Sequence, residues 1–121
     1  MIAKYFLDGH TKSAIIDTTQ DNMWRYRKVL PVENDKNIVT LGEGMTPLIP
    51  LTGLTKEYGV ELSLKDEAYN PTGSFKARGL AMAISKAKEL GVKACVIPTA
   101  GNAGGATVSY THLTLPTIYS V

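Results

Sequence analysis

"TKEYGVELSLKDE" at residues 55–67 and "AKELGVKACVIPT" at residues 87–99 form a near repeat, with Lys, Glu, a bulky residue, Gly and Val in the same order 32 residues apart. This spacing is typical of one β-α-β period. In each copy the glycine, Gly59 or Gly91, suits the left-handed backbone just past a helix end. The repeat therefore predicts an α/β fold in which helix, strand and loop follow one another twice.

The two strands predicted after these glycines differ in hydrophobic pattern. Residues 60–65 alternate apolar and polar side chains, whereas residues 94–97 form a continuous apolar run. A continuous run is expected of a strand covered on both faces, as in a parallel sheet. The helix between the strands needs one apolar face for that sheet, and its apolar residues recur at helical spacing. They are Leu80, Ile84, Ala87 and Leu90. The pattern predicts a parallel sheet covered by helices.

Residues 1–40 are predicted to be an extension and a linker in front of this core. Residues 1–17 alternate loosely between apolar and polar side chains, which predicts a short hairpin. Residues 21–31 predict a short helix, capped by Asp21 and stopped before Pro31.

The composition is that of one small domain: 121 residues, of which 44% are hydrophobic, are enough for one modest core. A net charge of +2 argues against nucleic acid or an anionic membrane as a partner. The basic and aromatic cluster at residues 24–28 is better explained by a helix with an anchored Trp24 and solvated charges than by nucleic-acid binding. No stretch approaches the roughly 18 apolar residues of a membrane helix. The single cysteine, Cys95, excludes an intrachain disulfide and favours a reducing, cytoplasmic location.

Two unusual loops follow the predicted strands. They are "NPTGSFKARG" at residues 70–79 and "PTAGNAGGA" at residues 98–106, the second with three glycines that let backbone amides approach a ligand. In an open parallel sheet the ligand site lies beyond the carboxyl ends of the strands. We therefore expect both loops to line one cleft. Neither loop has a dinucleotide or Walker-type fingerprint, so a nucleotide site is not predicted.

Lys76 stands in the first turn of the helix predicted after the first loop. A helix start disfavours a cation, but by only roughly 0.3 to 1 kcal/mol, less than one pKa unit at about 1.36 kcal/mol per unit. Burial beside Phe75 would therefore have to contribute most of any shift that frees the amine. From the residues alone, a solvated helix lysine is the simpler interpretation and a reactive lysine the alternative. Ser74 and Asn102 have side chains that suit helix caps.

Three motifs in order, "LGEGMTPL" at residues 41–48, "NPTGSFKARG" and "PTAGNAGGA", resemble the amino-terminal part of the fold type II pyridoxal-phosphate enzymes, and within them the threonine synthases. "MWRYRKVLP" at residues 23–31 is similar to the segment that precedes that core. The resemblance implies that residues 41–107 are an incomplete α/β core, a partial parallel-sheet three-layer unit of this fold. It also implies pyridoxal 5'-phosphate as the cofactor.

The resemblance assigns roles to side chains in both loops. Lys76 would form the Schiff base with the cofactor and later move protons on the substrate. Asn102 would hydrogen-bond the ring hydroxyl of the cofactor, and Ser74 would lie near the anionic end of the substrate. The substrate carboxylate would be received by Thr99, Ala100 and Gly101.

The implied reaction converts phosphohomoserine, a small-molecule amino acid, and water to threonine and phosphate. The parent enzyme would be a lyase of threonine biosynthesis, and a homodimer is compatible with the family. Threonine and serine ammonia-lyases resemble the chain at the same lysine, and "GEGMTPL" and "WRYRKVLP" favour the synthase. A non-catalytic remnant with no ligand is the alternative for the chain itself. A Ser-His-Asp hydrolase is disfavoured, because neither His10 nor His112 has a nucleophile motif beside it.

Residues 108–121 depart from the alanine-rich helix of the family. They are rich in β-branched and aromatic residues and contain Pro116, and all 24 charged residues of the chain precede Val108. The segment "VSYTHLTLPT" resembles an in-frame translation of a transposon-derived sequencing adapter. We therefore expect residues 108–121 to be a non-native tail joined to a gene cut short, and a poor helix. A genuine terminal strand is the alternative. A chain without the family's later phosphate-binding loop is expected to be inactive by itself.

Overall fold

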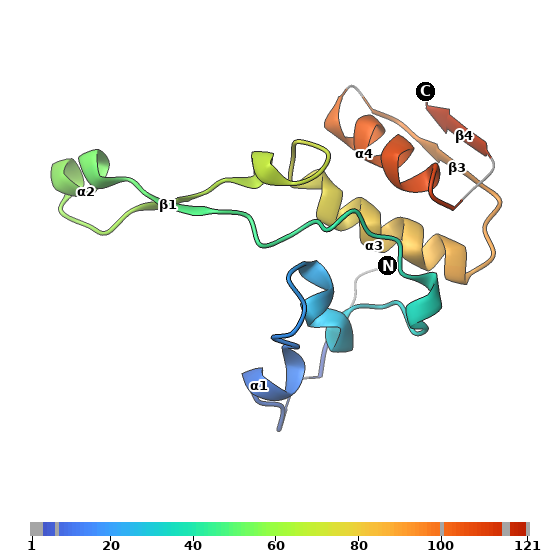
Figure 1. Ribbon diagram of the computed structural model, residues 1–121, viewed down its shortest axis with the longest axis horizontal. Helices are drawn as coiled ribbons and strands as arrows, with labels where there is room; N and C mark the ends of the chain where they lie inside the picture. Colours follow the sequence, from blue (N-terminus) through green and yellow to red (C-terminus); the bar gives the residue numbers. More distant parts are fainter. Residues whose placement is uncertain (1–3, 7, 100, 115–116, 121) are drawn as a thin grey trace.

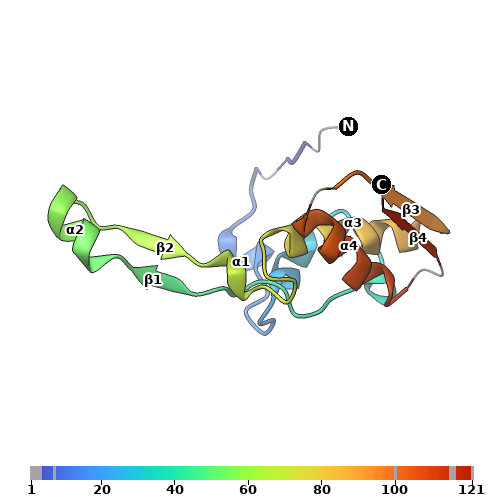
Figure 2. The same cartoon turned by 90° about the horizontal axis from the view of Figure 1, so that it is seen from above.

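The computed structural model describes residues 4–6, 8–99, 101–114 and 117–120, the last group as backbone. Figure 1 shows a long arm that projects from a body of packed helices. The arm consists of β1 (Leu48–Pro50), α2 (Thr52–Tyr58) and β2 (Ser63–Lys65). Figure 2 shows the same arm from above, extending well beyond α3 and α4.

The body is built on two helices, α3 (Lys76–Glu89) and α4 (Asn102–Thr111), which pack against each other. Their contact uses small residues, since Ala77, Ala81 and Ala106 are all fully buried. Strands β3 (Ala94–Ile97) and β4 (Thr117–Ser120) pair in parallel and contact α4. The core therefore lies between these two helices and the segment 23–39, which adds Met23, Trp24, Val32 and Val39 to it, with a two-stranded sheet against α4.

Strands β2 and β3 do not pair with each other. β2 pairs antiparallel with β1, with Leu48 opposite Lys65, and β3 pairs only with β4 among the described residues. These residues are thus an α/β arrangement of helices and two small sheets, and one parallel sheet holding both strands is not formed within the described part.

Several predicted apolar faces are exposed. Val60 and Leu64, two apolar positions of the alternating stretch 60–65, are exposed on the arm. Val96 of β3 is exposed too, although a strand covered on both faces was expected. Leu90, expected on the buried face of α3, is also exposed, whereas Ile84 is buried as predicted. These expectations are wrong because the described helices cover only one face of β3 and no face of the arm.

The predicted helix ends are confirmed at both glycines of the repeat. Gly59 follows α2 with a φ of 67°, and Gly91 follows the end of α3 with a φ of 70°. Both lie in the left-handed region that a residue with a Cβ atom rarely adopts. The repeated Gly-Val pair therefore marks the two turns from helix toward strand.

The described segment before the arm holds three short helical elements instead of a hairpin. They are the α-helical turn α1 (Lys12–Ile15) and the 3-10 helices η1 (Met23–Val29) and η2 (Asp35–Asn37). A further 3-10 turn, η3 (Glu67–Tyr69), follows β2. The predicted hairpin is wrong over residues 4–6 and 8–17, which contain no strand; its other residues lie outside the described part. The hydroxyl of Thr11 accepts the N–H of Ala14 and caps a helical turn there instead.

The predicted helix at residues 21–31 exists as η1, but its cap is Asn22 and not Asp21. The side chain of Asn22 accepts the N–H of Trp24 at 2.8 Å. Trp24 is 4% exposed, as expected of an anchor. Its burial removes the aromatic ring from any surface that the basic residues beside it present.

Residues 108–111 continue α4, so the expectation of a poor helix there is wrong. The hydroxyls of Thr107 and Thr111 donate to carbonyl oxygens one turn earlier, at 2.8 Å each, so these β-branched residues bury no unpaired oxygen. Tyr110 is fully buried in the core. Pro116 lies outside the described residues. A non-native origin for residues 108–121 stays a prediction. No helix in the described ranges has the length and apolar character needed to span a membrane.

Candidate active site

The start of α3 and the start of α4 open on one cavity of about 340 Å³. Phe75, Lys76, Gly79 and Leu80 line it from the first loop and α3, and Ile97 and Ala103 line it from β3 and α4. The prediction that the two loops meet at one cleft is therefore confirmed.

Lys76 is the first residue of α3, and its side chain is exposed. Its Nζ lies 4.8 Å from the centroid of the Phe75 ring, which is itself exposed. Such a contact attracts the ammonium group to the face of the ring. Lys76 therefore lacks the burial that the reactive-lysine interpretation requires, and in the described part of the chain it is a solvated lysine.

The loop in front of Lys76 is held by side-chain hydrogen bonds. The side-chain oxygen of Asn70 accepts the N–H of Gly44 at 3.1 Å, and the side-chain nitrogen of Asn70 donates to the backbone oxygen of Glu67 at 2.8 Å. Ser74 is buried, and its hydroxyl accepts the N–H of Lys76 at 3.3 Å. The cap position belongs to Phe75, but Ser74 does the hydrogen bonding that the sequence predicts.

Glu67 and Arg78 tie the root of the arm to α3. Nε and one terminal nitrogen of Arg78 each donate to the Glu67 carboxylate at 2.8 Å, and Thr46 and Asn70 donate to the same group. The hydrogen bond from Arg78, with smaller contributions from Thr46 and Asn70, lowers the pKa of Glu67 to about 2. In return, Glu67 raises the pKa of Arg78. The guanidinium is thus committed to Glu67, and Arg78 is not available to perturb Lys76.

The start of α4 is organised by Thr99. Its Oγ1 accepts the N–H of Gly101 at 3.2 Å and the N–H of Gly104 at 2.9 Å. A Cβ at Gly104 would lie 2.5 Å from the Thr99 methyl carbon, so a side chain there would displace Thr99. The predicted cap, Asn102, is wrong: it is the first residue of α4, it is exposed, and its side chain makes no cap hydrogen bond within the described part. Ala100 lies outside the described residues.

Sequence reasoning placed Thr99 in the site but missed its role as the cap of α4. The available signal was a threonine shortly before a predicted helix start, because its hydroxyl can accept a first-turn N–H. The pairing of Glu67 with Arg78 left no comparable signal, since the two residues are 11 positions apart across a loop.

The chemistry of this cavity suits an anionic carbonyl compound. A primary amine at Lys76 can attack a carbonyl carbon, and the first-turn amides of α4, with the positive end of the helix, favour an anion. Lys76 and a glycine-rich helix start therefore fit pyridoxal phosphate or an amino-acid carboxylate in the kind of donors they offer.

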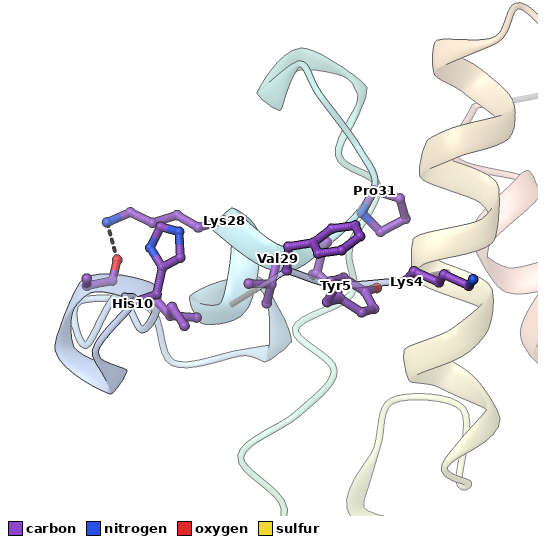
Figure 3. Close-up of a pocket in the computed structure, with 10 residues that line it drawn as sticks. Lys4, Tyr5, His10, Lys28, Val29 and Pro31 are labelled. Atoms are coloured by element: carbon purple, nitrogen blue, oxygen red, sulfur yellow. Dashed lines mark hydrogen bonds between the residues drawn. The ribbon is translucent and has the colours of Figure 1, made fainter. Parts of the chain in front are cut away.

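A second, larger cavity of about 690 Å³ lies away from Lys76, between residues 4–15 and η1 (Figure 3). Lys4, His10 and Lys28 bring basic groups to it. The Nζ of Lys28 already donates to the backbone oxygen of Ala14 at 2.6 Å, as the dashed line in Figure 3 marks. None of the described residues that line this cavity offers an amine at a helix start as Lys76 does, so the chemistry argues for the smaller one.

Comparison with known proteins agrees with this choice. The sequence profile of the family described as "Pyridoxal-phosphate dependent enzyme" matches residues 39–114. Three relatives are each named "Threonine synthase". That of Halalkalibacterium halodurans is 47% identical over 94 residues, which are 74% of this chain and 27% of the relative. That of Synechocystis sp. is 49% identical over 87 residues, 70% of this chain and 23% of the relative. That of Methanocaldococcus jannaschii is 44% identical over 89 residues, 73% of this chain and 22% of the relative.

The chain spans about a quarter of the length of these curated relatives. The profile match, in contrast, covers more than half of the chain and includes Lys76, Thr99 and Asn102. Lys76 is common to the motif, the lining of the cavity and the profile match. This chain belongs to the pyridoxal-phosphate dependent enzyme family.

Proposed function

We propose that this chain carries the lysine-bearing, amino-terminal part of a pyridoxal-phosphate dependent threonine synthase, a lyase that converts phosphohomoserine and water to threonine and phosphate. The observation that carries the proposal is the shared cavity, because Lys76 and Ala103, the residue after Asn102, line the same space. The names of the relatives favour the synthase over the ammonia-lyases.

The residues of the cavity have complementary tasks in this proposal. The Lys76 amine holds the cofactor and moves protons on the substrate carbon skeleton. Thr99, Ala100 and Gly101 receive the substrate carboxylate, while Asn102 orients the cofactor ring. Ser74 lies at the anionic end of the substrate. Pyridoxal phosphate, when bound, supplies an electron sink for the carbon skeleton of the amino acid.

The exposure of Lys76 supports low turnover by the chain as it stands. An active site strengthens its electrostatics by excluding water, and an amine open to solvent lacks that advantage. For the whole protein we propose the three-layer parallel-sheet core of fold type II, a cytoplasmic location and a homodimer.

Chemical trapping tests the proposal. The chain is incubated with pyridoxal phosphate, reduced with borohydride, digested, and mapped by peptide mass. Lys56, an exposed lysine on α2, is the internal reference. We expect the adduct at Lys76 to exceed that at Lys56 several-fold, and Lys76→Arg to abolish the excess. Equal labelling of Lys76 and Lys56 would contradict the proposal.

Turnover is measured separately as phosphate released from phosphohomoserine. We expect release close to that of Lys76→Arg, and rapid release that depends on Lys76 would show that the expected inactivity is wrong while the assignment of the lysine stands.

A further inference from the structure

Glu43 is a carboxylate with no solvent exposure, and neither the motif roles nor the cavity accounts for it. Its oxygens accept four hydrogen bonds: from Trp24 Nε1 at 3.1 Å, Thr40 Oγ1 at 3.0 Å, the Leu41 N–H at 2.9 Å and the Tyr110 hydroxyl at 3.0 Å. Among the described residues no cation forms an ion pair with it. A buried charge of this kind is tolerated only when its hydrogen bonds are all made.

The backbone of Glu43 is as constrained as its side chain. Its carbonyl oxygen accepts the N–H of Met23 at 2.7 Å. The next residue, Gly44, has a φ of 116°, and a Cβ there would lie 2.6 Å from the Met23 nitrogen. Gly44 in turn donates to Asn70, in the loop that leads to Lys76. Glu43 is therefore fixed against η1 and against the loop before α3 at the same time.

The bond from Tyr110 connects this fixed carboxylate to the far end of α4. Tyr110 and Asn102 stand near opposite ends of the same helix. Burial, and then the charge and the hydrogen bond of Glu43, raise the pKa of Tyr110, which keeps its hydroxyl a donor. Because α4 is a rigid rod, its start follows the position of Tyr110.

The buried faces of α3 and α4 combine small and large residues. They carry Ala77, Ala81, Ile84 and Ser85 on α3 and Gly104, Ala106, Thr107, Tyr110 and Thr111 on α4. The Tyr110 ring is the largest of the fully buried side chains, and its hydroxyl is held by Glu43. A polar anchor at this end of α4 therefore acts together with packing to set where the other end lies.

We propose that Glu43 is a positioning residue, which fixes α4 along α3 through Tyr110 and thereby sets the place of the α4 amides relative to Lys76. The effect of this positioning on the cofactor chemistry of Lys76 rests on the proposed function, whereas the positioning of α4 itself does not. Tyr110 also lies in the segment 108–121, so in this chain that segment takes part in building the site.

Tyr110→Phe is the test variant, because it removes the hydroxyl and keeps the ring volume in the core. Tyr58→Phe, at an exposed tyrosine of α2, is the matched control. Amide resonances are compared by NMR in the unliganded chain. We expect Tyr110→Phe to shift the amides of residues 102–105, at the other end of α4, and Tyr58→Phe to leave them unchanged. Shifts confined to residues 107–113 would overturn the proposal.

The trapping experiment supplies the second readout. We expect Tyr110→Phe to remove most of the several-fold excess of the Lys76 adduct over the Lys56 adduct and bring the ratio close to one, since small displacements of groups around a reacting centre cost large factors in rate. An unchanged ratio would contradict the positioning role, provided that the original chain labels Lys76 preferentially. If the original chain shows no such preference, the proposed function fails and the amide shifts alone decide the inference.

Glu43→Gln changes the acceptor in the same hydrogen bond. It places an NH₂ group among four donors, so at least one of them loses its acceptor. Trp24 is the single tryptophan of the chain and one of these donors, so its fluorescence reports the change directly. We expect altered Trp24 emission together with shifted amides at residues 102–105. Tyr110→Phe should leave the Trp24 emission as in the original chain. If Tyr110→Phe shifts the amides of residues 102–105 and Glu43→Gln does not, the two side chains do not act as one anchor and the proposal is contradicted.

Discussion

The arm of this molecule exposes apolar side chains, whereas the body buries them. On the arm, Leu48 is 65% exposed although leucine is strongly hydrophobic. In the body, Ala77 and Ala81 are fully buried although each contributes little apolar area. Burial therefore follows the presence of a packing partner more closely than it follows side-chain hydrophobicity. The body has such a partner in the α3–α4 pair, and the described residues offer none to the arm.

The same contrast holds for polar groups. In the body, the hydroxyl of Ser85 is fully buried, where it accepts the N–H of Val39 at 2.8 Å and donates to the Ala81 carbonyl at 2.7 Å. On the arm, all residues of β1 and β2 are exposed. Each buried hydrogen bond contributes roughly 0.5 to 1.5 kcal/mol net and costs more when it is left unmade. We therefore expect substitutions in the body to change stability far more than substitutions on the arm.

The largest expected effect comes from a pair of truncations. Ile84→Ala removes a side chain that is 3% exposed in the core, and should lower the free energy of unfolding by about 2 to 5 kcal/mol. Leu48→Ala on the arm is the matched control and should change it by less than about 0.5 kcal/mol. Denaturant titration of both variants measures the difference. Equal losses would show that the arm is packed in solution and would break the comparison.

Two neighbouring glycines in α4 give the next effect. Gly104→Ala should cost about 1 to 3 kcal/mol, because the new Cβ would displace Thr99 from the first-turn amides. Gly105→Ala meets nothing within 4 Å and should be neutral or stabilising by up to about 1 kcal/mol. Thermal unfolding of the two variants compares them. A reversed order would mean that Thr99 does not cap α4.

The ion pair between the arm root and α3 predicts a pH dependence. Glu67 has a lowered pKa of about 2 when folded, against an ordinary value of 4.5. The stability that this group contributes is therefore fully present above about pH 4.5 and is lost as the pH falls toward 2. Both partners are partly exposed, so we expect the loss to be on the order of 1 kcal/mol.

The pKa of Glu89 is lowered to about 2 as well, chiefly by Lys86, so Glu89 titrates over the same pH range as Glu67. The variant Glu67→Gln is therefore needed to isolate the contribution of Glu67. The stability difference between the original chain and Glu67→Gln should shrink between about pH 4.5 and 2. A difference that stays constant over this range would show that Arg78 does not hold Glu67 in solution.

The sequence predicted those features that depend on local chemistry. Gly59 and Gly91 mark helix ends, and the motif around Lys76 marks the loop-to-helix junction beside the cavity, because left-handed backbone and such junctions leave local signals. The partners of β2 and β3 left no such signal, since strand pairing depends on contacts far apart in sequence.

The buried faces were also predicted only in part. Hydrophobic spacing found Ile84, but it gave weight to Leu90 and none to Ala81, because a close contact between helices selects small residues. Helix propensity failed for residues 108–111, where the burial of Tyr110 and its bond to Glu43 outweigh a weak intrinsic preference. The sequence left open whether the amine of Lys76 is solvated or buried, because burial depends on neighbours that no local pattern reveals.

The central claim is that the starts of α3 and α4 form one site, and NMR titration with pyridoxal phosphate tests it most directly. We predict that the amides of Lys76 and of residues 102–105 shift together, with one apparent affinity, while those of Gly53 and Gly59 on the arm stay in place. Shifts at Lys76 without any at residues 102–105, or equal shifts around Lys56, would contradict the claim.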